Sequence, residues 1–175
     1  MRIQVIEGGC PSLERRHVRA TRFLSVFILP DSKQVARLNI VILHCHLERG
    51  GVTQVIENHV RSLRDREDVS QIVLVSGNRA SGLSKSTRQA VKQLTVDDFD
   101  YDDRRWDASN LVGRATALAS QITSELDSLD VRPSDSVLHW HNHSLGKNTA
   151  GPEVIRLLAM EGWRLLLQMH DFAED

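Results

Sequence analysis

From Leu38 onward the chain alternates short apolar runs with longer segments in which apolar residues recur every three or four positions. Continuous β-branched and aliphatic runs are typical of strands buried on both faces of a parallel sheet, and the longer repeat is typical of helices with one buried face. The runs predict strands at 38–43, 72–75, 136–141 and 165–170. The repeats predict helices that begin at Gly51, near Ala108 and near Pro152.

The segment from 76 to 107 has no sustained period and is polar throughout, with six aspartates between Asp97 and Asp107. We expect a long excursion here, with one short helix at 88–94. Asp98, Asp100 and Asp102 are spaced like the start of a calcium loop. However, Asp103 occupies the position where that loop needs glycine, and Ser109 the position where it needs a bidentate glutamate. A solvated acidic loop is the better interpretation.

Strands separated by helices call for right-handed crossovers, so we expect an α/β fold with a Rossmann-like parallel sheet and flanking helices over residues 38–175. Residues 1–37 differ, because they contain mostly basic charges, several glycines and prolines, and no sustained period. A secretory or organelle signal fits them poorly, so we expect a poorly ordered leader. Since no helix follows the fourth strand, we also expect a fold that is incomplete at its C-terminus, with an exposed strand edge.

Composition narrows the function classes. The chain has 175 residues, 41% of them hydrophobic, and a net charge of −1, so it has no positive field for nucleic acid. No apolar run approaches the length of a membrane span. Two cysteines make no disulfide framework, and Cys45 lies in an apolar run as a buried thiol would, which favours a reducing compartment and a cytoplasmic protein.

Polar groups follow the predicted strands at the places where doubly wound sheets bind their ligands. Six of the eight histidines, together with Gly50 and Gly51, should gather at this rim of the sheet. Two glycines at a helix start let an anion approach the backbone N–H groups, although a plain glycine turn explains them as well. The histidines could bind zinc, but hydrogen-bonded side chains lining a polar cleft are the preferred interpretation, and we predict no metal.

The order of these motifs resembles the N-terminal domain of family 4 glycosyltransferases of the GT-B fold. The resemblance covers residues 38–175 and rests on three segments, each after a strand: Glu48-Arg49-Gly50-Gly51-Val52, His141-Asn142-His143 and His170-Asp171. It implies the acceptor-side half of a two-domain enzyme whose other half, which grips a nucleotide sugar, has no counterpart here. Activity of this half alone is therefore doubtful.

The resemblance also assigns residues. It implies that Gly50 and Gly51 contact the donor diphosphate or the acceptor, and that His170, with Asp171 beside it, reaches the transferring sugar. It implies retention of anomeric configuration with no cofactor and no obligatory metal, the nucleotide sugar being a co-substrate. The sugar, lipid or polysaccharide acceptor would meet four polar residues: His46, His141, Asn142 and His143. Peripheral membrane association is a further expectation.

Two other function classes stay open from the sequence. One is a histidine-rich metal-binding hydrolase or metal sensor, which the histidines after the strands would serve. The other is a non-catalytic Rossmann-like interaction module, against which the expected apolar edge speaks.

Overall fold

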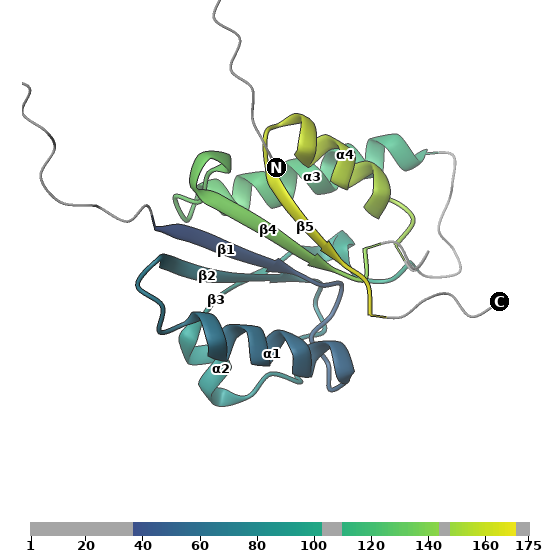
Figure 1. The fold of residues 1–175 in the computed structure, drawn as a ribbon. Coiled ribbons are helices and arrows are strands. Elements are labelled where there is room, and N and C mark those ends of the chain that lie inside the picture. Colours follow the sequence, from purple (N-terminus) through teal and green to yellow (C-terminus); the bar gives the residue numbers. More distant parts are fainter. Residues whose placement is uncertain (1–36, 103–109, 144–147, 171–175) are drawn as a thin grey trace, which may run out of the picture. The chain divides into compact units, whose positions relative to one another are not determined.

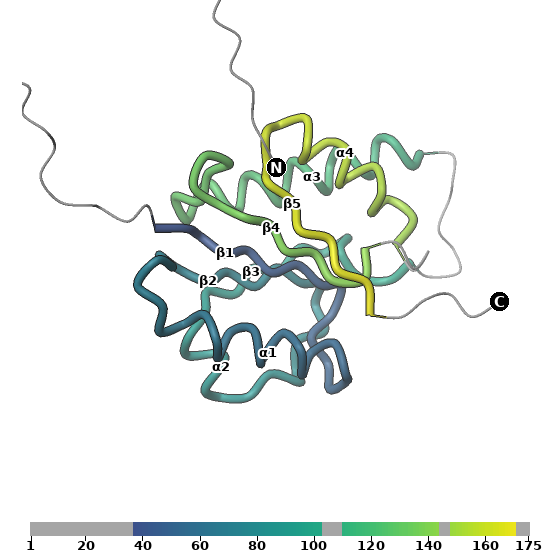
Figure 2. The backbone as a smooth tube through the Cα atoms, in the orientation of Figure 1, coloured from purple at the N-terminus to yellow at the C-terminus, as the bar shows by residue number. Residues whose placement is uncertain are grey.

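The computed structural model describes residues 37–102, 110–143 and 148–170, which form an α/β layer (Figure 1). Apart from Arg37, the expected leader lies outside these residues. Five strands make one parallel sheet in the order β3-β2-β1-β4-β5. The backbone trace shows β1 in the middle of the sheet, between β2 and β4 (Figure 2).

The elements follow one another as strand and helix along most of the chain. In order they are β1 (Leu38–Leu43), α1 (Gly51–Leu63), β2 (Val69–Ser76), α2 (Lys85–Ala90), β3 (Lys92–Thr95), η1 (Asp97–Phe99), α3 (Leu111–Asp127), η3 (Pro133–Asp135), β4 (Ser136–His141), α4 (Gly151–Met160) and β5 (Arg164–Gln168). No helix of the described segments is long and apolar enough to cross a membrane.

The predicted fold class is confirmed, with one strand more than expected. The segment from 76 to 107 was expected to be a long excursion, but it contains α2 and β3, and the helix expected at 88–94 is wrong beyond Ala90. Strand β3 is short, lies at the edge and has the mostly polar sequence Lys-Gln-Leu-Thr. Hydrophobic periodicity therefore could not reveal it, because an edge strand buries little.

The sheet separates two hydrophobic layers. Helices α1 and α2 cover one face, where Ile42 of β1 packs with Ile56 of α1. Helices α3 and α4 cover the other, where Leu43 of β1 packs with Leu118 of α3 (Figure 1). Adjacent residues of β1 thus serve opposite layers, as the period of a strand requires. Each such fully buried side chain stabilises the fold by about 1.5–3 kcal/mol.

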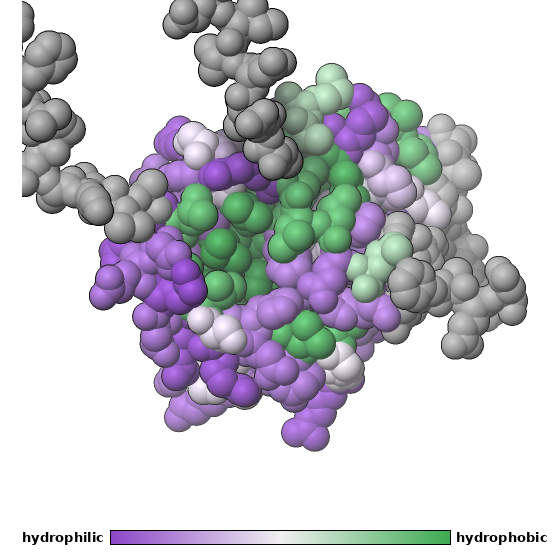
Figure 3. Space-filling model, in the orientation of Figure 1, coloured by the Kyte–Doolittle hydropathy of each residue, from purple (hydrophilic) through white to green (hydrophobic). Residues whose placement is uncertain are grey.

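Strand β5 lies at the open edge next to β4 and exposes apolar side chains. Leu166 is 52% and Leu167 40% exposed, and Met169 just beyond the strand is 45% exposed. The space-filling view shows hydrophobic surface along this strand (Figure 3). This agrees with the apolar edge expected from the sequence, and such surfaces are places where further protein binds.

Two loops at the carboxyl end of the sheet touch through their backbones. The N–H of Gly82, in the loop between β2 and α2, donates to the carbonyl oxygen of Leu47, in the loop between β1 and α1, at 2.7 Å. A Cβ atom on Gly82 would lie 2.7 Å from that oxygen and closer still to Glu48 C and Arg49 N. Only glycine permits this approach, which holds the residues after β1 in place.

We predict that Gly82→Ala lowers the free energy of unfolding by about 1–3 kcal/mol, because the added methyl group meets backbone that has to move. Gly51→Ala is the matched control, since a Cβ there has nothing within 4 Å and a helical alanine adds up to about 1 kcal/mol. Urea unfolding followed by circular dichroism measures both. Equal stability of Gly82→Ala and the parent chain would contradict the close approach.

Candidate functional site

The residues that follow β1 and β4 meet at one rim of the sheet, although almost a hundred positions separate them. Nδ1 of His44 donates to the carbonyl oxygen of His141 at 3.2 Å. The ring of His46 lies 5.3 Å from that of His44 and 5.0 Å from that of Tyr101, which follows β3 and η1. Three strand ends thus contribute to this rim, as the strand-end rule predicts.

His170, which follows β5, is fixed by two contacts with the end of β4. Its Nε2 lies 2.7 Å from Nδ1 of His141, and the two rings are stacked with an interplanar angle of 6°. Its N–H donates to Oδ1 of Asn142 at 2.8 Å. Asn142 itself takes a positive φ of 54°, a conformation that asparagine tolerates better than most residues. The expected neighbour Asp171 lies outside the described residues.

A second group of imidazoles lies on the face of β4 that α1 covers. His139 and His141 alternate with core residues along β4, and their ring centroids are 4.2 Å apart. The ring of His59, from α1, lies 5.1 Å from His139 and 5.5 Å from His141. We call His59, His139 and His141 the imidazole cluster.

Burial keeps the imidazole cluster neutral. Burial, and then the nearby His139 and His170, lower the pKa of His141 to about 3. Burial also lowers the pKa of His139 and that of His59. The ionisable groups that shift these three pKa values are other histidines, which would repel an added proton and not stabilise it. The three rings are therefore neutral at pH 7.

The glycine pair begins α1 beside a pocket of about 370 Å³. Gly50 is the N-cap residue, and no side chain caps the helix. The walls of the pocket come from α1 and from the loop before α2: Arg49, Gly50, Thr53, Gln54, Glu57, Ser81, Gly82, Leu83 and Ser84. The exposed Arg49 and the free space around both glycines suit an anionic group at the helix start.

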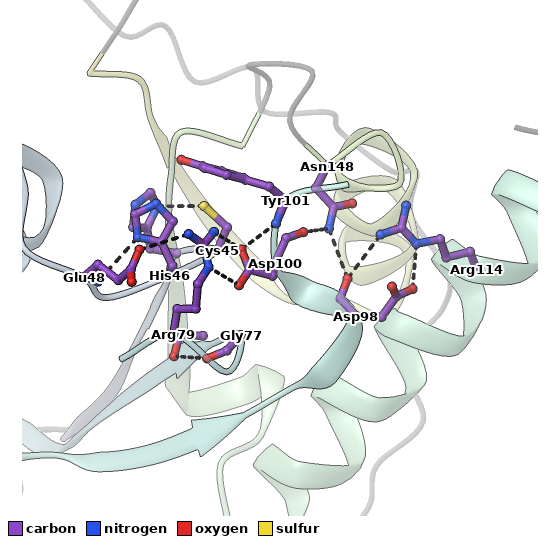
Figure 4. Close-up of polar contacts among 12 residues, drawn as sticks. Cys45, His46, Glu48, Gly77, Arg79, Asp98, Asp100, Tyr101, Arg114 and Asn148 are labelled. Atoms are coloured by element: carbon purple, nitrogen blue, oxygen red, sulfur yellow. Dashed lines mark hydrogen bonds and ion pairs between the residues drawn. The ribbon is translucent and has the colours of Figure 1, made fainter. Parts of the chain in front are cut away.

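Ion pairs between Arg79 and two carboxylates join the residues that follow β1, β2 and β3. Arg79, which follows β2, contacts both Glu48 at 2.9 Å and Asp100 (Figure 4). The hydrogen bonds that Arg79 donates to Asp100 raise the pKa of Arg79 above its usual value, so its guanidinium stays charged. The Arg79 guanidinium also lies 5.5 Å above the ring of Tyr101. This pairing holds the β1 loop against the segment after β3.

A second set of pairs ties the same segment to α3 and α4. Arg114 of α3 contacts Asp98 at 2.6 Å and also Asp102. The N–H and the hydroxyl of Thr149 each donate to Asp102 at 2.7 Å. Asn148 donates to the carbonyl oxygens of Asp98 and Asp100 (Figure 4). The expectation of a solvated acidic loop is wrong for Asp100 and Asp102, whose side chains are 22% and 10% exposed, whereas Asp98 is 55% exposed. Asp103 and Asp107 lie outside the described residues.

Cys45 is buried as expected and lies close to Tyr101. Burial raises the pKa of the Cys45 thiol. Burial and the neighbouring thiol also raise the pKa of Tyr101. Both groups are therefore protonated at neutral pH, so Cys45 is a packing residue at this rim and a poor nucleophile.

The structure brings most of the predicted site residues to the rim, in separate places. His141, Asn142 and His170 are joined by contacts, whereas His46 lies beside Tyr101, and Gly50 and Gly51 begin α1. His143 lines a narrow crevice. The other residues that line it are Cys45, Phe99, Tyr101, Trp140, Asn142, Asn148 and Gly151. His141, the last residue of β4, has no exposed surface in the part of the chain that the structure describes and lies next to His59 of α1. Its predicted contact with an acceptor stays a prediction, and here it contacts His170 at the rim.

Sequence reasoning missed several residues of this rim. His59 is not among the predicted site residues, although it continues the three-to-four spacing of the buried face of α1 and that spacing is a usable signal. Nothing in the sequence around Arg79 and Arg114 indicates a site role, because their carboxylate partners are distant in the chain and are brought near only by the fold. Gly82 lies in a polar loop where glycine is common.

The fold is that of a Rossmann-like α/β domain with its polar groups at the carboxyl ends of the strands. No family model and no solved structure matches the chain. The chain is 26% identical over 138 residues to mannosylglucosyl-3-phosphoglycerate synthase of Petrotoga mobilis, a glycosyltransferase. The match covers 78% of this chain but 26% of that protein, so the chain spans about a quarter of the relative's length.

We predict that Asp102→Asn lowers the free energy of unfolding by about 1.5–3 kcal/mol at pH 7, because it weakens bonds to the Arg114 guanidinium and Thr149. Burial raises the pKa of Asp102, but the Thr149 and Arg114 donors outweigh it and hold the pKa below its usual value of 3.8. The carboxylate's contribution is therefore present above pH 3.8 and lost as the pH falls toward the folded-state pKa.

The difference between Asp102→Asn and the parent chain should shrink between pH 7 and pH 3, as urea unfolding at each pH measures. Asp127→Asn is the matched control, because Asp127 is 68% exposed and lies 3.6 Å from Arg132. It should change stability by less than about 0.5 kcal/mol at either pH. A pH-independent loss for Asp102→Asn would contradict an ionic role for this carboxylate.

Proposed function

We propose that residues 38–175 are the acceptor-side part of a retaining, family 4, GT-B glycosyltransferase that transfers a sugar from a nucleotide-sugar donor. The observation that carries this proposal is that His46, Asn142 and His170 lie at the same rim of the sheet as the glycine start of α1. Ligands bind at this rim in doubly wound sheets. The distant likeness to a glycosyltransferase supports the same chemistry.

The start of α1 is the proposed anion-binding element. Departure of a nucleoside diphosphate leaves negative charge, which fixed backbone N–H groups and a helix N-terminus stabilise. Gly50 and Gly51 have open space where a side chain would otherwise stand, and Arg49 adds a positive charge to the same pocket. The group bound here is the donor diphosphate or an anionic group of the acceptor.

His170 is proposed to hydrogen-bond the transferring sugar. Its backbone is held by Asn142 and its Nε2 by His141, which leaves Nδ1 to meet a sugar hydroxyl or carbonyl group. A histidine held in this way orients the sugar and needs no covalent step. The buried His141 then acts through His170, and Asp171 is proposed as the neighbour that completes this end of the site.

The acceptor is proposed to lie between the ends of β1 and β4, where His46, Asn142 and His143 supply polar groups. It is a sugar, a lipid or a polysaccharide precursor, and in the lipid case the protein associates peripherally with a membrane. The donor-gripping part of the enzyme is proposed to lie in a second domain outside this chain, consistent with the quarter of the relative's length that the chain spans. A cytoplasmic location completes the proposal.

We predict that His170→Ala, in the complete gene product, lowers kcat for sugar transfer roughly 100-fold, because one positioned hydrogen bond to the reacting sugar is lost. Transfer from labelled nucleotide sugars is the assay. Ser62→Ala, at the exposed end of α1, should behave as the parent. If His141 acts through His170, adding His141→Ala to His170→Ala should cost little more. Full activity of His170→Ala, or no binding of any nucleotide sugar, would end the proposal.

We predict that Gly51→Asp raises KM for the anionic substrate at least about tenfold relative to Gly51→Asn. The two side chains have the same size, so the comparison isolates the charge that competes for the helix N-terminus. The fold should survive both changes, because a Cβ at this position meets no atom within 4 Å. Steady-state kinetics supplies KM, and thermal unfolding checks the fold. Equal KM values for the two variants would place the anion elsewhere.

A further inference from the structure

The imidazole cluster has the donor set of a transition-metal site. One ring nitrogen of each of His59, His139 and His141 lies within 4.8 Å of the others. His139 and His141 project from the same face of β4, and His59 approaches them from α1. Three histidine nitrogens are an established set for zinc, in which bonds of about 2.0–2.1 Å bring the nitrogens about 3.3 Å apart.

Within the part of the chain that the structure describes, two buried ring nitrogens of the cluster have no partner. Nδ1 of His59 and Nε2 of His141 are buried and have no hydrogen-bond partner within the described residues. A buried polar atom without a partner is costly, and such atoms are unusual in folded proteins. A cation at the centre of the cluster would satisfy both nitrogens at once. Both nitrogens belong to the three rings that lie close together, so their lack of partners and the ring geometry indicate the same site.

On His139 and His141, the other ring nitrogen has the kind of partner that metal-binding histidines have. Nε2 of His139 lies 2.8 Å from Oε1 of Gln168, and since this oxygen only accepts, Nε2 carries the proton and Nδ1 a lone pair. Nδ1 of His141 lies 2.7 Å from His170, so a proton on Nδ1 leaves a lone pair on Nε2. Such partners orient ligating rings and fix their tautomer.

We propose that His59, His139 and His141 bind one divalent transition-metal ion, with zinc as the best fit. Imidazole nitrogen suits zinc, cobalt, nickel and copper, and the absence of a carboxylate among the three donors disfavours magnesium and calcium. The half-buried His59 gives the ion a path from solvent. The ion would hold α1 against β4 and fix the tautomer of His141. This metal site does not rest on the proposed glycosyl transfer, although His141 also contacts His170.

A different group nearby must be distinguished from this site. His44, Cys45 and His46 also bring possible metal ligands within 4.8 Å of one another. However, burial raises the pKa of the Cys45 thiol, and metals bind the thiolate, so this group is the weaker candidate. A thiolate ligand also gives bound cobalt an intense ultraviolet charge-transfer band, which three imidazoles do not.

The test is titration of the chelator-treated 175-residue chain with Zn²⁺ by calorimetry and with Co²⁺ by absorption spectroscopy. We expect one equivalent of either metal, visible cobalt bands of a four-coordinate site and no thiolate band. His59→Ala should weaken binding at least about tenfold, and His46→Ala should leave it unchanged. Ring-nitrogen NMR of the labelled parent chain should show three histidines shifted by zinc, a result that depends on no variant's folding.

Three results would overturn the proposal. They are failure of the parent chain to bind zinc or cobalt stoichiometrically, a thiolate band that disappears in His46→Ala, and zinc-induced shifts confined to histidines outside the cluster. None of them bears on sugar transfer, which the His170 variant tests separately.

Discussion

The pairing of β1 with β4 is the constraint on which the site depends. The chain crosses from β3 through α3 to the far side of β1, so that Leu43 lies level with Trp140 in the sheet. The residues that follow these two strands must then meet, and His44 does contact the carbonyl group of His141. Strand order in a doubly wound sheet reverses at this place, which makes a crevice between neighbouring strand ends. Every side chain proposed to meet a sugar belongs to this crevice or its borders.

The rim has two electrostatically different halves. Beyond β2 and β3, charged pairs built on Arg79 and Arg114 hold the loops, with the carboxylates of Asp100 and Asp102 kept ionised. At and just beyond β4 the polar groups include His139, His141 and His143, and burial lowers the pKa of each, which favours the neutral ring. The first half supplies rigidity that depends on charge, and the second supplies hydrogen-bonding and metal-binding nitrogen atoms. A neutral substrate and a cation are therefore suited to the second half, and an anion to the glycine start of α1.

Much of the fold could be predicted because strands β1, β2 and β4 are largely buried and each has a short apolar core. The glycine start of α1 was also predictable from the sequence. Strand β3 could not be predicted, since Lys92 and Gln93 look like loop residues and the strand gains its stability from β2. The meeting of His59 with the β4 histidines depends on how α1 packs on the sheet. Local spacing shows that His59 faces the core but does not show what it meets there.

The contact between Gly82 and the backbone after β1 makes the two loops one mechanical unit. Thirty-five positions separate Gly82 from Leu47 in the chain, yet neither loop can change its path without the other. Anyone redesigning the glycine pocket for a new ligand should therefore treat the β1 and β2 loops as a single part to be exchanged together. Changes to the side chains of Gln54 and Ser84, which line the same pocket, leave that joint backbone untouched.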